Sequence, residues 1–118
     1  MAIQKFDDIL AWQKSHELTL RVYKITESFP KSEIFGLVSQ MRRCAVSVPS
    51  NLAEGFKRRT KSDSLHFYNI AEGSLEELKY QLLLSKDLGY ISRDAYSDIR
   101  DLSEESGKLI YGWKKIQR

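Results

Sequence analysis

The sequence predicts an all-α protein, an up-and-down antiparallel four-helix bundle that fills residues 1–118 as one domain. Apolar residues recur at spacings of three and four in four successive stretches, which is the period of helices with one buried face. The 118 residues include only six glycines and two prolines, so few breaks separate these stretches. Short connections between long helices favour antiparallel neighbours, and a chain of this length can bury a core of its own.

The first helix is predicted to end before Pro30. Its core stripe follows helical spacing at Leu18, Val22, Ile25 and Phe29. Three further apolar residues lie partly off that stripe: Trp12, Leu20 and Tyr23. They indicate that this helix has a second apolar face.

A second helix is predicted to start near Ser32, an acceptable N-cap, with Glu33 in the first turn, where negative charge suits the helix dipole. Its apolar positions keep one phase throughout: Leu37, Met41, Cys44, Val48, Leu52 and Phe56. Because this phase continues through Pro49, we predict one helix that is kinked at Pro49 and ends near Gly55. The alternative is two short helices that meet at the proline.

A third helix is predicted to run from a cap at Thr60 or Ser62 to a left-handed stop at Gly89. Its stripe consists of Tyr68, Ala71, Leu75, Leu78 and Leu82. A fourth helix opens at Ser92 and Asp94 and continues to the chain end. Its stripe consists of Ile99, Leu102, Ser106, Leu109, Trp113 and Ile116.

A run of three leucines, residues 82–84, is too wide for one core stripe. At ~100° per residue the three side chains spread over about 200° of the helix circumference. We therefore expect self-association, with an interface that includes Trp12, Tyr23, Leu83 and Leu84. The alternative is a wide core face with a few exposed leucines, which is common in monomers.

Polar residues form a line beside the apolar stripe of the second helix: Gln40, Arg43, Ser47, Asn51 and Glu54. The third helix repeats the spacing at Ser74, Glu77 and Gln81. If the two lines face each other, Arg43 can pair with Glu77 in an interhelical network. Ser47 and Asn51 can then satisfy the backbone groups that Pro49 frees. The alternative is an ordinary solvated face.

Charge is unevenly distributed, although the formal net charge is only +3. Residues 42–61 hold six basic residues and one acidic residue, a net charge of +5, whereas residues 62–107 hold four basic and ten acidic residues, a net charge of −6. The most basic stretch consists of Lys57, Arg58, Arg59 and Lys61. Such a stretch can contact nucleic-acid phosphates while reading little sequence. The alternative is a loop that only keeps the protein soluble or balances the acidic helices.

Nothing in the sequence indicates catalysis or a cofactor. Two near-identical sequence motifs occur, NLAEG at residues 51–55 and NIAEG at residues 69–73, which we call the repeated phrases. They contain Glu54 and Glu72. Neither glutamate is followed three residues later by the histidine that a carboxylate metal site in a helix bundle uses. We interpret the phrases as helix packing, in which Ala and Gly permit close approach. His16 and His66 have no ligand partner and Cys44 is the only cysteine, so we expect no metal site and no disulfide.

The beginning of the sequence, MAIQKFDDIL, has neither the apolar core nor the cleavage site of a signal peptide. No apolar run approaches the ~20 residues that span a bilayer. We therefore expect a cytoplasmic protein without a membrane partner.

Three stretches carry a family resemblance: FDDILAWQKSHELTLRVY, FPKSEIFGLVSQMRRCAVSVPSNLAEG and NIAEGSLEELKYQLLLSKDLGYI. They resemble the 23S ribosomal RNA intervening-sequence proteins over essentially the whole chain. The resemblance implies an up-and-down bundle, a ring of five copies and a bacterial origin. It also implies kinship with the accessory proteins of diversity-generating retroelements, which bind a reverse transcriptase and nucleic acid.

Together these features predict a non-enzymatic, homo-oligomeric scaffold that associates with RNA or DNA through its basic stretch. The alternative is a protein-binding adaptor, for example an accessory subunit of a reverse transcriptase, without direct nucleic-acid contact. An enzyme is the weakest hypothesis, because no motif supports one.

Overall fold

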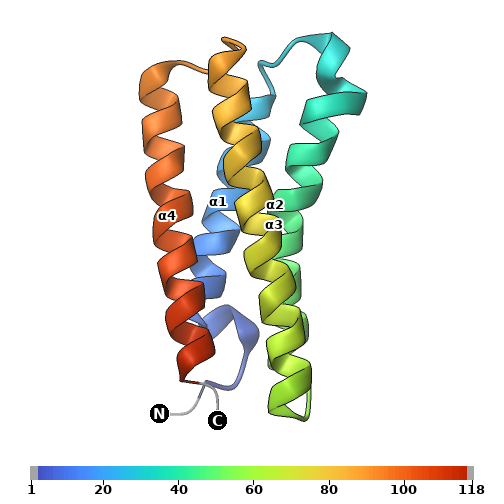
Figure 1. Cartoon of the computed structure of the whole chain (residues 1–118), viewed down its shortest axis with the longest axis vertical. Helices are drawn as coiled ribbons and strands as arrows, with labels where there is room; N and C mark the ends of the chain where they lie inside the picture. Colours follow the sequence, from blue (N-terminus) through green and yellow to red (C-terminus); the bar gives the residue numbers. More distant parts are fainter. Residues whose placement is uncertain (1–2, 117–118) are drawn as a thin grey trace.

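Four long helices make up most of the computed structural model, which describes residues 3–116 (Figure 1). They are α1 (Leu10–Thr26), α2 (Ser39–Phe56), α3 (Lys61–Asp87) and α4 (Arg93–Lys115). Short turns precede α1 and α2: η1 (Phe6–Asp8), η2 (Lys31–Glu33) and η3 (Ile34–Val38). No strand occurs between residues 3 and 116. The predicted all-α class is confirmed.

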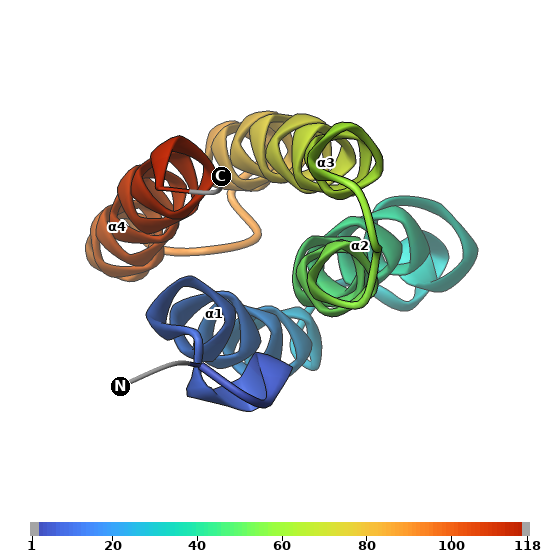
Figure 2. The same ribbon diagram turned by 90° about the horizontal axis from the view of Figure 1, so that it is seen from below.

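Seen along its axis, the bundle has its helices in chain order around one core, with α1 also beside α4 (Figure 2). Consecutive helices run in opposite directions, which confirms the predicted up-and-down topology (Figure 1). Each predicted stripe supplies fully buried side chains, such as Val22, Val48, Leu78 and Ile99. None of the helices in the described part of the chain is long and apolar enough to cross a membrane.

The first helix ends at Thr26, earlier than the stripe predicted. Its last predicted apolar residue, Phe29, is nevertheless buried, because the chain turns after Thr26 and the ring packs 5.2 Å from that of Tyr90. The apolar spacing therefore continues past the end of the helix, because a turn can bury an apolar side chain as well as a helix can.

The start of the second helix near Ser32 was predicted wrongly, because α2 begins at Ser39. In the π-helical turn η3, Gly36 leaves the helical region, with φ −113° and ψ −109°. The cap comes from Glu33 instead of Ser32: Glu33 Oε1 accepts from the backbone N–H of Leu37 at 3.2 Å. Glu33 Oε2 accepts from the hydroxyl of Tyr90 at 2.9 Å, which raises the pKa of Tyr90 and ties this segment to the α3–α4 turn.

One continuous helix, α2, contains Pro49, so the alternative of two short helices is wrong. The kink itself stays a prediction. Proline has no N–H, and the carbonyl of Ala45 therefore lacks its usual partner four residues later. That carbonyl is buried, and the hydroxyl of Thr19 in α1 donates to it at 2.9 Å. The same hydroxyl lies 2.9 Å from the carbonyl oxygen of Ser15.

The predicted role of Ser47 and Asn51 at this proline is wrong. Asn51 Nδ2 donates to the carbonyl oxygen of Ser47 at 2.8 Å and to its hydroxyl at 3.0 Å. Neither acceptor is the group that Pro49 frees, because the freed group is the carbonyl of Ala45. The compensating donor comes from another helix.

We expect Thr19→Val to lower the free energy of unfolding by about 1–3 kcal/mol, because valine keeps the shape of threonine and leaves the Ala45 carbonyl buried without a donor. Urea denaturation measures the loss. In a Pro49→Ala background the new N–H of residue 49 can serve the carbonyl, so Thr19→Val should cost less there. Equal costs in the two backgrounds would contradict this role for Thr19.

Candidate functional site

The basic stretch of the sequence lies at the turn between α2 and α3, at the lower end of the bundle in Figure 1. We call Lys57, Arg58, Arg59 and Lys61 the basic turn. Thr60 caps α3 by accepting from the N–H of Asp63 at 3.1 Å, which confirms one of the two predicted caps. Because α2 ends at Phe56 and α3 starts at Lys61, only four residues connect the two helices, and this short connection keeps the four cations close together.

The four cations are not equivalent. Arg58 pairs with Glu54 one helical turn earlier, and its guanidinium lies 4.5 Å from the centre of the Phe67 ring. Lys57, Arg59 and Lys61 are exposed and form no ion pair within residues 3–116. A polar pocket of about 180 Å³ lies beside them. The charge available to an external ligand therefore comes mainly from three side chains.

The Phe and Tyr rings near the basic turn pack against other groups of the protein, whereas the His66 ring is exposed. Tyr68 is buried, which raises the pKa of its hydroxyl, and Phe56 packs 6.4 Å from Trp113. Phe67 is half-buried and is covered by Arg58. Since stacking on bases needs an open ring face, the turn is suited to phosphates.

Both glutamates of the repeated phrases bind cations. Glu54 pairs with Arg58, whereas Glu72 accepts from Lys114 of α4 at 2.6 Å. Lys114 also donates to Asn69 Oδ1 at 2.7 Å, so the second phrase joins α3 to α4. Spacing could not reveal Lys114 as the partner, because it lies more than 40 residues away in sequence.

In the described residues, one hydrogen bond joins the predicted polar line of α2 to that of α3. The hydroxyls of Ser47 and Ser74 share a hydrogen bond of 2.8 Å. Arg43, in contrast, is exposed and donates to Gln40. No ion pair joins Arg43 to Glu77 in the part of the chain that the structure describes, so the predicted pair is absent there.

Gln81, the last residue of the polar line on α3, lies between Glu77 and Cys44. Gln81 Nε2 lies 3.4 Å from Glu77 Oε2 and 3.6 Å from Cys44 Sγ. Burial, together with nearby Glu77, raises the pKa of the Cys44 thiol. A buried neutral thiol packs as a small apolar group and is a poor nucleophile.

The predicted interface residues differ in exposure. Trp12 is half-buried between the rings of Phe6, at 5.0 Å, and His16, at 4.9 Å, and Leu84 is also half-buried. Tyr23 and Leu83 are 41 % and 38 % exposed, so both can contact another molecule. Three apolar residues outside the predicted interface are more exposed than these: Leu20, which the sequence placed on the second apolar face of the first helix, and Phe35 and Tyr80.

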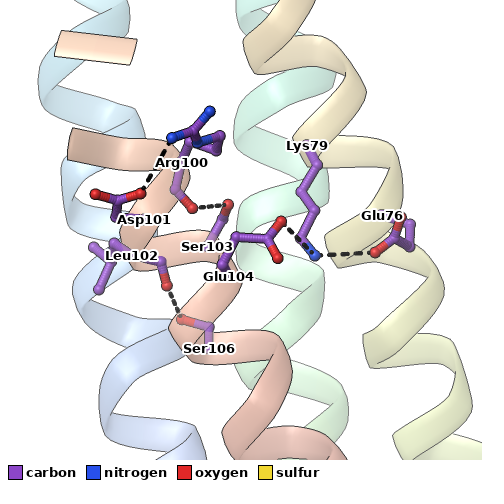
Figure 3. Close-up of polar contacts among 8 residues, drawn as sticks. All are labelled: Glu76, Lys79, Arg100, Asp101, Leu102, Ser103, Glu104 and Ser106. Carbon is purple, nitrogen blue, oxygen red and sulfur yellow. Dashed lines mark hydrogen bonds and ion pairs between the residues drawn. The ribbon is translucent and has the colours of Figure 1, made fainter. Parts of the chain in front are cut away.

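An ion-pair cluster joins α3 to α4 (Figure 3). The ammonium of Lys79 lies 3.1 Å from Glu76 and 3.2 Å from Glu104. Burial lowers the pKa of Lys79, but the hydrogen bonds and charges of the two carboxylates outweigh it and raise the pKa overall. Between residues 3 and 116, no three side chains of His, Cys, Asp or Glu lie together as a metal site would require.

The sequence is similar to one protein family, and the fold is similar to that of a solved structure. The family model described as 23S rRNA-intervening sequence protein matches residues 7–112. A crystal structure of a protein of unknown function from the S23 ribosomal protein family, from Bacteroides thetaiotaomicron VPI-5482, superposes with a TM-score of 0.82 at 26 % identity. The match covers 90 % of this chain and 96 % of that chain. No curated protein matches the sequence.

The surroundings of Gly55 and Gly73, the glycines of the two repeated phrases, predict opposite effects of Gly→Ala on stability. A Cβ at Gly55 would lie 2.5 Å from Tyr68 Cε1 and 3.1 Å from Ser64 O, so close approach is required there. A Cβ at Gly73 would meet nothing within 4 Å, so the packing interpretation is wrong for that glycine. We expect Gly55→Ala to destabilise the protein by about 1–3 kcal/mol through overpacking. Gly73→Ala should stabilise it by about 0.5–1 kcal/mol, because alanine favours the helix.

Urea denaturation of both variants against the wild type checks the pair. The two substitutions add the same methyl group, so each serves as the control of the other. Equal effects would show that the approach of α2 to the Tyr68 ring does not need glycine.

Proposed function

The chain belongs to the 23S rRNA-intervening sequence protein family, and on that premise we propose a non-enzymatic, homo-oligomeric bundle that binds nucleic acid through the basic turn. The observation that carries the proposal is the group of three exposed cations, Lys57, Arg59 and Lys61, at one end of the bundle. Their potentials add, because the turn holds them close together without a carboxylate between them.

The ligand chemistry follows from the geometry of the turn. Exposed cations on this turn can approach phosphate oxygens of either RNA or DNA, and each contact releases counterions from the nucleic acid. Reading sequence requires contacts to base edges or open stacking rings, and the Phe56, Phe67 and Tyr68 rings beside the turn pack inside the protein or are covered by Arg58. We therefore propose binding with little sequence preference.

Self-association would strengthen such binding. The resemblance implies a ring of five copies, and the exposed Tyr23 and Leu83 support contact between copies. When several basic turns engage one nucleic acid, each further contact becomes intramolecular, so the overall affinity exceeds that of a single turn.

A second candidate is a protein-binding adaptor, for example an accessory subunit of a reverse transcriptase. The observation that favours it is the amount of exposed apolar surface, which includes Phe35 at 97 % exposure. Such a surface fits a protein better than a phosphate backbone.

The proposal predicts weaker binding when all four residues of the basic turn are changed to alanine. The variant should bind a labelled RNA hairpin and a mixed-sequence DNA duplex more weakly, and the slope of log affinity against log salt should fall by about one for each phosphate that the variant no longer neutralises. Fluorescence anisotropy over a salt series measures both. Circular dichroism and light scattering confirm that fold and assembly persist.

A matched control removes the same charge elsewhere, from two arginines and two lysines that are exposed outside the turn: Arg21, Lys24, Arg93 and Lys108. This control should keep most of the affinity and the slope. Among single variants, Arg59→Ala should weaken binding more than Arg58→Ala, because Glu54 already pairs with Arg58. An equal decrease in affinity in the turn variant and the control would reduce the effect to net charge, and unchanged binding in both would favour the adaptor.

A further inference from the structure

We propose that Phe35 anchors a contact between two copies of this chain, with its ring inserted into the groove between α3 and α4 of the next copy. The proposal rests on the homo-oligomeric part of the proposed function and does not depend on nucleic-acid binding. It assigns a residue to each side of the contact, and the two sides are different surfaces of the same chain.

Phe35 is the most exposed large apolar side chain in residues 3–116, at 97 %. It lies in η3, which is fixed on its N-terminal side by Glu33, since the two oxygens of that carboxylate bind Leu37 N and the Tyr90 hydroxyl. An anchor on a supported segment loses little further freedom on binding. Ile34 beside it is exposed as well, so η3 presents two adjacent apolar side chains.

The surface around Phe35 is apolar with a basic edge. A groove of about 920 Å³ between α1, η3 and α2 includes Tyr23, Phe29 and Val38, together with three cations, Lys31, Arg42 and Arg43, and one carboxylate, Glu27. Arg42 is held in place by Thr26 Oγ1 at 3.0 Å and the Tyr23 carbonyl at 3.3 Å, and it lies over the Tyr23 ring. It forms no ion pair among the residues that the structure describes, so its charge is available to a partner.

The groove between α3 and α4 has the complementary character. Its volume is about 320 Å³, and its apolar lining includes Tyr80, Leu83 and Tyr96. Tyr80 is 61 % exposed, so the groove is open to a side chain from outside. Two carboxylates, Glu76 and Glu104, and two cations, Lys79 and Arg100, line it (Figure 3). The wider stretch that contains the groove, residues 62–107, carries a net charge of −6. An apolar anchor with a basic edge therefore meets an apolar groove in an acidic part of the chain.

The two surfaces lie in the same half of the bundle. Segment η3 stands at the upper end of the bundle, where α3 ends and α4 begins, and the groove residues belong to the upper halves of these helices (Figure 1). Viewed along the axis, the segment before α2 projects away from α4 (Figure 2). Two copies that stand side by side in the same orientation can therefore bring the Phe35 side of one to the α3–α4 side of the other. A contact between unlike surfaces builds a ring when the rotation closes.

Light scattering on three variants tests the contact. Phe35→Ser removes the anchor and Leu83→Glu blocks the groove, and each should weaken self-association by about ten- to a hundredfold, as expected when one phenyl ring is no longer buried. Leu10→Ser, at another exposed apolar residue, is the control and should keep the wild-type mass. Since Phe35 is exposed within the chain, circular dichroism should show Phe35→Ser fully folded.

Mixing the two variants gives the sharper result. A Leu83→Glu copy still carries Phe35, and a Phe35→Ser copy still carries an open groove, so one intact contact can form between them. The mixture should therefore yield a heterodimer of twice the chain mass of 13.7 kDa, and nothing larger. A contact between two identical surfaces would give no such rescue.

An oligomeric wild type whose mass is unchanged by Phe35→Ser would overturn this inference and leave the homo-oligomer standing. A monomeric wild type would overturn both the inference and the homo-oligomeric part of the proposed function. Because Phe35 lies in η3, at the opposite end of the bundle from the basic turn, Phe35→Ser leaves the four cations of the turn unchanged (Figure 1). Nucleic-acid binding is therefore tested separately, by comparing the basic-turn variant and its charge-matched control in the same oligomeric state.

Discussion

The bundle depends on one hydrogen bond between helices, from the Thr19 hydroxyl to the carbonyl of Ala45. Without it, a proline in the middle of α2 would leave a buried carbonyl unsatisfied, at a cost of about 1–3 kcal/mol, which is a large fraction of the stability of a small domain. With it, α2 stays continuous and fills three roles. It buries Met41, Val48 and Leu52 in the core, it meets α3 through Ser47, and its end positions the basic turn.

Periodicity was sufficient to predict the fold, because four stripes of apolar residues at helical spacing have few other ways to be buried. The phase through Pro49 also predicted one helix correctly, since two independent helices would have no reason to share it. The start of α2 could not be predicted in this way. Residues 31–38 keep helical spacing, while Gly36 and the Glu33 carboxylate impose a π-helical turn, and that choice depends on Tyr90, a residue distant in sequence.

Prediction of the candidate site was limited for a similar reason. The four cations of the basic turn are neighbours in the sequence, so the sequence alone shows that they lie together. It does not show that Arg58 pairs with Glu54 and lies over the Phe67 ring. The polar line was correct at Ser47 and Ser74, where the helices are close, and failed at Arg43, which is exposed. The spacing of residues shows which side chains share a face of a helix. Whether they contact the next helix also depends on how close that helix lies, which spacing does not show.

The short turn between α2 and α3 also bears on the order in which the chain folds. Closing it orders only residues 57–60, and it brings Gly55 against the ring of Tyr68, 13 positions later, so the entropic cost of this contact is small. Packing α1 against α4 joins the two ends of the described chain and carries a larger cost. We therefore expect the α2–α3 hairpin to form early in the transition state and α1 to dock later, when Thr19 reaches the carbonyl that the proline left open.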